Sequence, residues 1–135
     1  MSAADVLRKL YAALSTGDVP GLIACIDPDV IVDEPPALPY GGVHHGRDVF
    51  LQSILGTMMG HAAIELTEYE VFENETGAIG KLVGTLTAHT TGEVFPLTMI
   101  EVHDIVGETS RKIDVYIKDP AALAAFYARS EKTSA

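Results

Sequence analysis

The chain has 135 residues, enough for one domain with a sizeable core, and its 19 acidic against 9 basic side chains give a formal net charge of −10 at pH 7. An acidic chain without a basic run suits neither nucleic acid nor an anionic membrane surface, and its apolar runs are too short to span a bilayer, so we expect none of these partners. The single cysteine cannot form an internal disulfide, and the N-terminus lacks a signal-peptide pattern, so we expect a cytoplasmic protein.

Two helices are predicted at the N-terminus. Ser2 and Asp5 have the spacing of a capping box, and the first helix should end at Gly17. Asp18 can cap a second, shorter helix that runs through Ile26. The first helix has one apolar stripe that should face the core, formed by Val6, Leu7, Leu10, Tyr11 and Leu14.

A short strand over residues 30–34 should follow and stop at two prolines. Side chains alternate along a strand, so Glu34 shares a face with Val30 and Val32. A carboxylate directed into apolar surroundings is costly unless it is paired, hydrogen-bonded or protonated. Glu34 is therefore a candidate for chemistry, and the alternative is a strand-end carboxylate that reaches solvent.

The next segment, residues 35–46, is rich in proline and glycine and is predicted to be a loop. It contains Tyr40 and the adjacent pair His44 and His45. Two neighbouring histidines cannot easily point at one site, and no third ligand lies near them, so we expect no metal site. A third helix should then cover roughly residues 48–59.

From residue 64 onward the apolar pattern has a period of two. It predicts four strands joined by short turns into an antiparallel meander, at residues 64–73, 79–90, 93–106 and 111–118. Asp119 and Pro120 should begin a last helix that runs to about Tyr127. Helices followed by a strongly bent sheet indicate an α+β fold, with one domain over residues 1–135.

The alternation also predicts which side chains face the helices. In strand 93–106 the bulkier apolar face carries Glu101 and His103 as polar exceptions. Together with Glu34 and Tyr11, they should converge on an apolar interior, which is the usual composition of a small-molecule pocket. The apolar residues expected to contact a substrate there are Leu14, Met58, Leu82, Leu86, Leu97, Met99, Val115 and Ile117.

Two acids beside one apolar site should have their pKa values pushed apart, so that one stays ionised and the other protonated. The alternative for Glu101 is a buried structural pair with His103 or Tyr11. For Tyr11 itself the alternative is core packing. Gly84, on the inward face of its strand, should leave space in the interior.

The chain resembles the nuclear transport factor 2 family, and within it the branch of ketosteroid isomerases and SnoaL-like polyketide cyclases. Four segments carry the resemblance, at residues 12–18, 32–35, 40–48 and 114–120. It implies a cone-shaped, curved antiparallel sheet that wraps over the N-terminal helices and encloses an apolar pocket. This fold hosts many reactions, so the resemblance identifies the fold better than the activity.

The resemblance also implies roles for single residues. Glu34 takes the place of the aspartate that shuttles the proton in ketosteroid isomerases, and Glu101 that of a protonated aspartate in their oxyanion hole. Leu10 stands where those enzymes have the oxyanion-hole tyrosine. Tyr11 is the next residue, about 100° further round the helix.

We therefore expect metal-free and cofactor-free acid–base chemistry on a small apolar carbonyl compound, by an isomerase, cyclase or dehydratase. Glu34 would be the base, and Glu101 or Tyr11 would stabilise the developing enolate. The alternative is a non-catalytic ligand-binding or association domain of the same fold. An enzyme should have a pocket open to solvent with Glu34 at its wall, whereas the alternative should have a closed or shallow interior.

We also expect a homodimer through the outer face of the sheet. That face has more apolar surface than a monomer normally exposes. The residues that supply it are Val94, Thr98, Ile100, Val102 and Tyr116.

Overall fold

The computed structural model describes residues 1–131 and begins with two helices, α1 (Ala3–Thr16) and α2 (Val19–Ala24). The capping box is confirmed, because the Asp5 N–H donates to Ser2 Oγ and the Ser2 N–H donates to the Asp5 carboxylate. Gly17 ends α1 with a left-handed backbone, at φ 71°. The second helix stops two residues before the predicted end, because Ile26 already belongs to the first strand.

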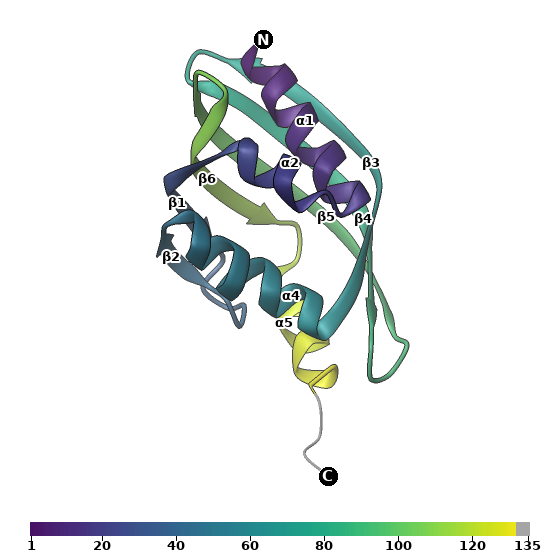
Figure 1. The fold of residues 1–135 in the computed structure, drawn as a ribbon. Helices are drawn as coiled ribbons and strands as arrows, with labels where there is room; N and C mark the ends of the chain where they lie inside the picture. Colours follow the sequence, from purple (N-terminus) through teal and green to yellow (C-terminus); the bar gives the residue numbers. More distant parts are fainter. Residues whose placement is uncertain (132–135) are drawn as a thin grey trace.

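Within residues 1–131, six strands form one curved sheet in the order β2-β1-β6-β5-β4-β3. Their bounds are β1 (Ile26–Glu34), β2 (Gly42–His45), β3 (Ala62–Asn74), β4 (Gly77–Ala88), β5 (Val94–Val106) and β6 (Thr109–Ile117). Neighbouring strands are antiparallel except for one pair, since β1 runs parallel to β6. The meander from β3 to β6 is confirmed. The sheet packs against the N-terminal helices and is an α+β fold (Figure 1).

Strand β2 lies inside the segment that the sequence predicts to be a loop. It pairs with the end of β1, with Glu34 opposite Gly42 and Ile31 opposite His45. The strand has four residues and no apolar alternation, so the sequence carries no local sign of it. Its position is set by pairing with β1, and the chain between the two strands turns back beside Glu34.

The third predicted helix is a continuous helical run over residues 47–61. It consists of α3 (Arg47–Val49), a wider π-helical stretch (Phe50–Leu55) and α4 (Gly56–His61). The last helix, α5 (Pro120–Arg129), starts at its predicted cap, where the Asp119 carboxylate accepts the Ala122 N–H.

The predicted inward faces are confirmed. In β5, Leu97, Met99 and His103 are buried, and in β6, Ile113 and Val115 are buried. The helices α1 and α2 cross one end of the inner face, and the run over residues 47–61 crosses the other end (Figure 1). The core therefore lies between the sheet and these two groups of helices.

The space expected at Gly84 is filled by backbone. A side chain at this position would collide with the main chain of β3 at Glu65 and Leu66, where the pairing of β3 with β4 is irregular. Gly84 therefore permits the close approach of two strands and does not enlarge the interior.

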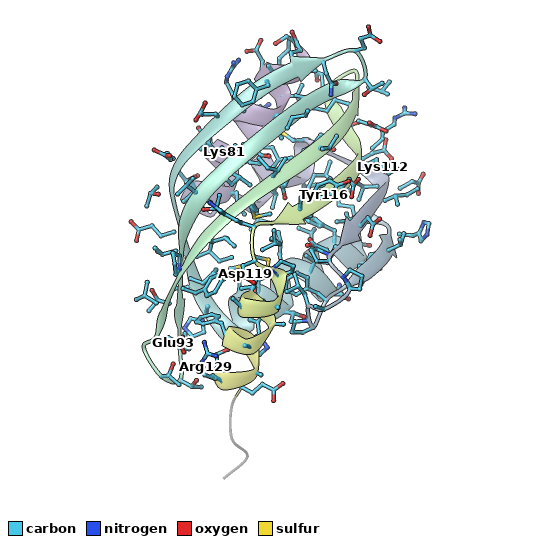
Figure 2. The ribbon with its side chains drawn as sticks, turned by 180° about the vertical axis from the view of Figure 1, so that it is seen from behind. Lys81, Glu93, Lys112, Tyr116, Asp119 and Arg129 are labelled. Atoms are coloured by element: carbon cyan, nitrogen blue, oxygen red, sulfur yellow. The ribbon has the colours of Figure 1, made fainter. Side chains whose placement is uncertain are left out.

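The outer face of the sheet carries Lys81 and Tyr116, and α5 lies toward one end of the molecule (Figure 2). Tyr116 is 57% exposed and Val94 is 56% exposed. The homodimer through this face stays a prediction. In the part of the chain that the structure describes, every helix is too short or too polar to cross a membrane.

Candidate active site

An apolar pocket lies between the helices and the inner face of the sheet. Its cavity volume is about 50 Å³. One water molecule needs about 10–15 Å³ by that measure, so the walls stand close together. Glu34, Tyr40, Glu101 and His103 are its polar wall residues.

Six of the eight predicted substrate-contacting residues line the pocket: Leu14, Met58, Leu82, Leu97, Met99 and Ile117. The other two, Leu86 and Val115, are buried but are not part of this wall. Sequence reasoning did not assign the remaining wall residues to a substrate site: Leu10, Leu22, Tyr40, Phe50, Ile54, Leu55, Ile64, Leu66, Ile113 and Leu123. Most of them belong to apolar faces that the sequence identifies only as core.

Glu34 is the last residue of β1 and is only 6% exposed. Within residues 1–131 its carboxyl has no hydrogen-bond partner, and it lies on the pocket wall. Burial raises the pKa of Glu34 to about 9, and the nearby charges of Glu101 and Asp33 add to the effect. The group therefore holds its proton at neutral pH.

Glu101 in β5 reaches the same pocket, but its carboxyl has hydrogen-bond partners. The Tyr11 hydroxyl donates to Glu101 Oε1 at 2.9 Å, and His103 Nε2 lies 3.2 Å from the same oxygen. His103 is fully buried, and its Nδ1 lies 2.8 Å from Ser110 Oγ. Because both ring nitrogens have partners, the imidazole is held in one orientation.

Tyr11 is not among the residues that line the pocket, and its hydroxyl contacts the pocket residue Glu101. Burial, followed by the charge of Glu101, raises the pKa of the Tyr11 hydroxyl, which therefore remains a hydrogen-bond donor. Gly80 in β4 lies opposite Glu101, and a side chain there would collide with the Tyr11 ring. Gly80 is thus the glycine that makes room for this cluster.

Sequence reasoning misses a second polar pair, of which Tyr40 lines the pocket. Tyr40 Oη lies 2.9 Å from Tyr127 Oη, and both rings are buried. Burial raises the pKa of Tyr40, with Tyr127 the next cause, and burial raises the pKa of Tyr127 to about 12. No local pattern could have paired them, because one lies in the loop after β1 and the other in α5.

The two adjacent histidines do not converge on a site. His44 Nε2 donates to the Tyr40 backbone carbonyl at 2.8 Å, whereas His45 is exposed. This bond ties β2 to the loop that positions Tyr40. Over residues 1–131, no group of three or more His, Cys, Asp or Glu side chains could hold a metal ion.

Comparison with solved structures places the fold among known ones. An NTF2-like protein of unknown function from Burkholderia pseudomallei is 24% identical, with a TM-score of 0.81, and the match covers 94% of this chain and 98% of that chain. A putative polyketide cyclase from Pseudomonas putida is 21% identical, with a TM-score of 0.71, covering 86% and 91%. At these identities the likeness establishes the nuclear transport factor 2-like fold alone.

Sequence comparison identifies the family. An uncharacterized protein of Mycobacterium tuberculosis is 26% identical over 125 residues, covering 92% of this chain and 95% of that protein. The family model described as "SnoaL-like domain" matches residues 7–113, which contain Glu34, Tyr40, Glu101 and His103. The chain therefore belongs to the SnoaL-like domain family.

Proposed function

We propose that this protein is a cofactor-free acid–base enzyme that moves a proton at the carbon next to a carbonyl group in a small apolar compound. Isomerisation, cyclisation and dehydration all pass through such a step. The observation that carries the proposal is Glu34, a residue only 6% exposed on the wall of an apolar pocket, whose carboxyl stays partly accessible and has no hydrogen-bond partner in residues 1–131. Such a group is costly to the fold, which is typical of a catalytic acid or base.

The two carboxyl groups at the pocket are suited to complementary tasks. Glu34, whose pKa burial raises to about 9, can donate a proton at neutral pH. Glu101 Oε1 accepts from Tyr11 and lies beside His103 Nε2, an arrangement that stabilises a carboxylate. A proton donor and a proton acceptor in one apolar pocket are the pair that enolisation of a ketone requires.

This assignment changes the first step expected from the resemblance. A protonated Glu34 cannot begin the reaction as the base, so it first donates to the carbonyl oxygen while Glu101 accepts the proton from the neighbouring carbon. The enol then forms with Glu34 deprotonated and Glu101 protonated. Return of a proton to a different carbon completes an isomerisation and restores both groups.

The comparisons support a carbonyl substrate without identifying one. One solved structure of this fold is described as a putative polyketide cyclase. Polyketide-type compounds carry ketone groups with exchangeable neighbouring protons, which matches the chemistry that the two carboxyls can perform. The apolar wall favours a compound with few polar groups beyond its carbonyl.

Deuterium exchange tests the proposal without knowledge of the natural substrate. 1-Indanone is apolar and has exchangeable protons beside its carbonyl, so NMR in D₂O can follow their replacement. We expect the wild type to accelerate exchange and Glu34→Gln to lower that acceleration by at least about a hundredfold. Glu65→Gln, which changes an exposed glutamate of β3, is the matched control and should exchange at the wild-type rate.

The same experiment separates the enzyme from the non-catalytic alternative. Binding of 1-indanone by the wild type without accelerated exchange would favour a ligand-binding domain. Equal exchange in the wild type and Glu34→Gln would show that Glu34 has no part in the reaction.

A further inference from the structure

Two pairs of a buried serine and a histidine lie at different places in this fold. In the first, Ser110 Oγ lies 2.8 Å from His103 Nδ1, and His103 lines the pocket. In the second, Ser130 Oγ lies 2.9 Å from His61 Nδ1, and neither residue lines the pocket. A serine hydroxyl has one proton, so within each pair either the serine or the imidazole nitrogen is the donor. The other contact of each serine decides which.

The proton of Ser130 is used outside its pair. Ser130 Oγ donates to the Tyr127 backbone carbonyl at 2.9 Å, a normal hydrogen-bond distance, and a carbonyl can only accept. Both contacts of Ser130 are therefore hydrogen bonds only if its oxygen accepts from His61. The imidazole of His61 must then carry a proton on Nδ1.

Ser110 has no second acceptor of comparable quality. The Lys112 backbone carbonyl lies 3.4 Å from Ser110 Oγ, whereas O–H···O hydrogen bonds measure about 2.5–3.0 Å. His103 Nδ1, at 2.8 Å, is the better acceptor, so we assign the Ser110 proton to this bond. Nδ1 of His103 is then unprotonated, and the proton of its neutral imidazole is on Nε2.

This tautomer determines what Glu101 receives. His103 Nε2 lies 3.2 Å from Glu101 Oε1 and has a proton to donate, and the Tyr11 hydroxyl donates to the same oxygen at 2.9 Å. Two donors on one oxygen suit a carboxylate. Oε2 has no hydrogen-bond partner within residues 1–131, and no fully buried side-chain oxygen in that range lacks one, so Oε2 is accessible. The oxygen that Glu101 can offer to a ligand is therefore Oε2.

We propose that Glu101 Oε2 is the atom that takes the proton in the proposed reaction. Tyr11, His103 and Ser110 are positioning residues that hold the other oxygen. The inference rests on the proposed function and deepens it by naming the reacting atom and the residues that direct it. The C–H bond beside the carbonyl breaks, its proton moves to Oε2, and its electron pair forms the double bond of the enol while Glu34 protonates the carbonyl oxygen.

Ser110, His103 and Glu101 are also the residue types of a hydrolytic triad. Ser110, however, is fully buried and is not among the residues that line the pocket. A nucleophile has to reach the substrate, so Ser110 is not one and its effect passes through His103.

The two serine–histidine pairs allow an NMR test that needs no ligand. ¹⁵N spectra of the imidazole rings show which nitrogen carries a proton, and at pH 8 an ordinary imidazole is neutral. We expect the proton of His103 on Nε2 and that of His61 on Nδ1, so that the two rings are opposite tautomers in one spectrum. A proton on His103 Nδ1 alone would overturn the proposal, because the proton between Nε2 and Oε1 would then belong to Glu101. Two protons on His103 would also overturn it, since Ser110 could not be the donor.

Ser110→Ala tests whether this chain of contacts directs the reaction. The imidazole behind the Glu101 carboxylate would lose the bond that fixes it, so in deuterium exchange of 1-indanone we expect kcat to fall about tenfold while KM stays within about twofold. Ser130→Ala is the matched control, because it removes the same kind of contact away from the pocket. Both of its kinetic constants should stay near the wild-type values. Should Ser110→Ala not fold, the wild-type spectrum still decides.

The outcomes separate this inference from the proposed function. An unchanged kcat in Ser110→Ala would refute the positioning role, and so would equal losses in Ser110→Ala and Ser130→Ala. The expected tautomers without exchange in the wild type would keep the assigned protons and refute the proposed function. Exchange by a wild type whose His103 carries its proton on Nδ1 would keep the function and refute this inference.

Discussion

Glu34 and Glu101 reach the same pocket but are held in opposite ways. The Glu101 carboxyl has the Tyr11 hydroxyl and the His103 imidazole as partners, and the imidazole is itself bonded to the Ser110 hydroxyl. Glu34 has apolar neighbours and no hydrogen-bond partner within residues 1–131. The comparison teaches that hydrogen bonds offset the cost of burying one pocket acid, whereas the other, without partners, weakens the fold.

The largest expected difference between the two sites is in how stability depends on pH. Below pH 4.5 Glu34 is protonated in both the folded and the unfolded protein. Between 4.5 and about 9 only the unfolded chain loses the proton, so stability falls as pH rises. Each pH unit in this range removes about 1.4 kcal/mol, or roughly 3 kcal/mol by pH 7. Above about pH 9 Glu34 is ionised in both the folded and the unfolded protein, and the loss of stability no longer grows.

Glu34→Gln should therefore be more stable than the wild type at pH 8 and nearly equal to it at pH 4.5. Urea unfolding at several pH values measures this. Glu65→Gln is again the control, because its exposed side chain should not alter the slope. A gain in stability that does not grow with pH would mean that the Glu34 carboxyl is ionised in the folded protein.

Glu101→Gln should lower the stability of the folded protein, whereas Glu34→Gln should raise it. The substitution removes the carboxyl whose Oε1 accepts from Tyr11 and lies 3.2 Å from His103 Nε2, and hydrogen bonds to charged groups contribute about 1.5–3 kcal/mol. We expect a loss of that size in the free energy of unfolding at pH 7. The control is Glu93→Gln, which breaks an exposed pair with Arg129 and should cost clearly less. No loss in Glu101→Gln would show that these contacts do not stabilise the folded protein.

The smallest expected effect is that of Tyr11→Phe. It removes one of the two hydrogen bonds to Glu101 Oε1 while His103 remains, so we expect a loss of about 1 kcal/mol in unfolding free energy. Binding of 1-indanone should change little, because Tyr11 does not line the pocket. A large loss of ligand affinity in this variant would place Tyr11 in direct contact with the ligand.

Much of the fold follows from local patterns. Period-two alternation predicts the inward faces of β5 and β6, and the capping residues predict the starts of α1 and α5. The same alternation predicts that Glu34, Glu101 and His103 face one shared interior. These predictions succeed because each depends on residues that are neighbours in the sequence.

The rest depends on contacts between distant segments. Strand β2 exists because it pairs with β1, and nothing in its own four residues indicates a strand. Tyr40 and Tyr127 meet across 87 positions of sequence. Gly80 and Gly84 look alike along β4, yet one faces the Tyr11 ring and the other faces the backbone of β3. Such roles are decided by packing, which a single sequence does not display.

The π-helical stretch over residues 50–55 decides which side chains of this helical run face the pocket. In a regular α-helix, successive residues turn by about 100°, so Leu55 would point about 140° away from Phe50. The wider turn brings both side chains to the same wall, together with Met58. Deleting one residue here would restore the α-helical phase and rotate the side chains that follow by about 100°. Single-residue insertions and deletions in this run could therefore change ligand selectivity while the sheet and its two carboxyl groups stay in place.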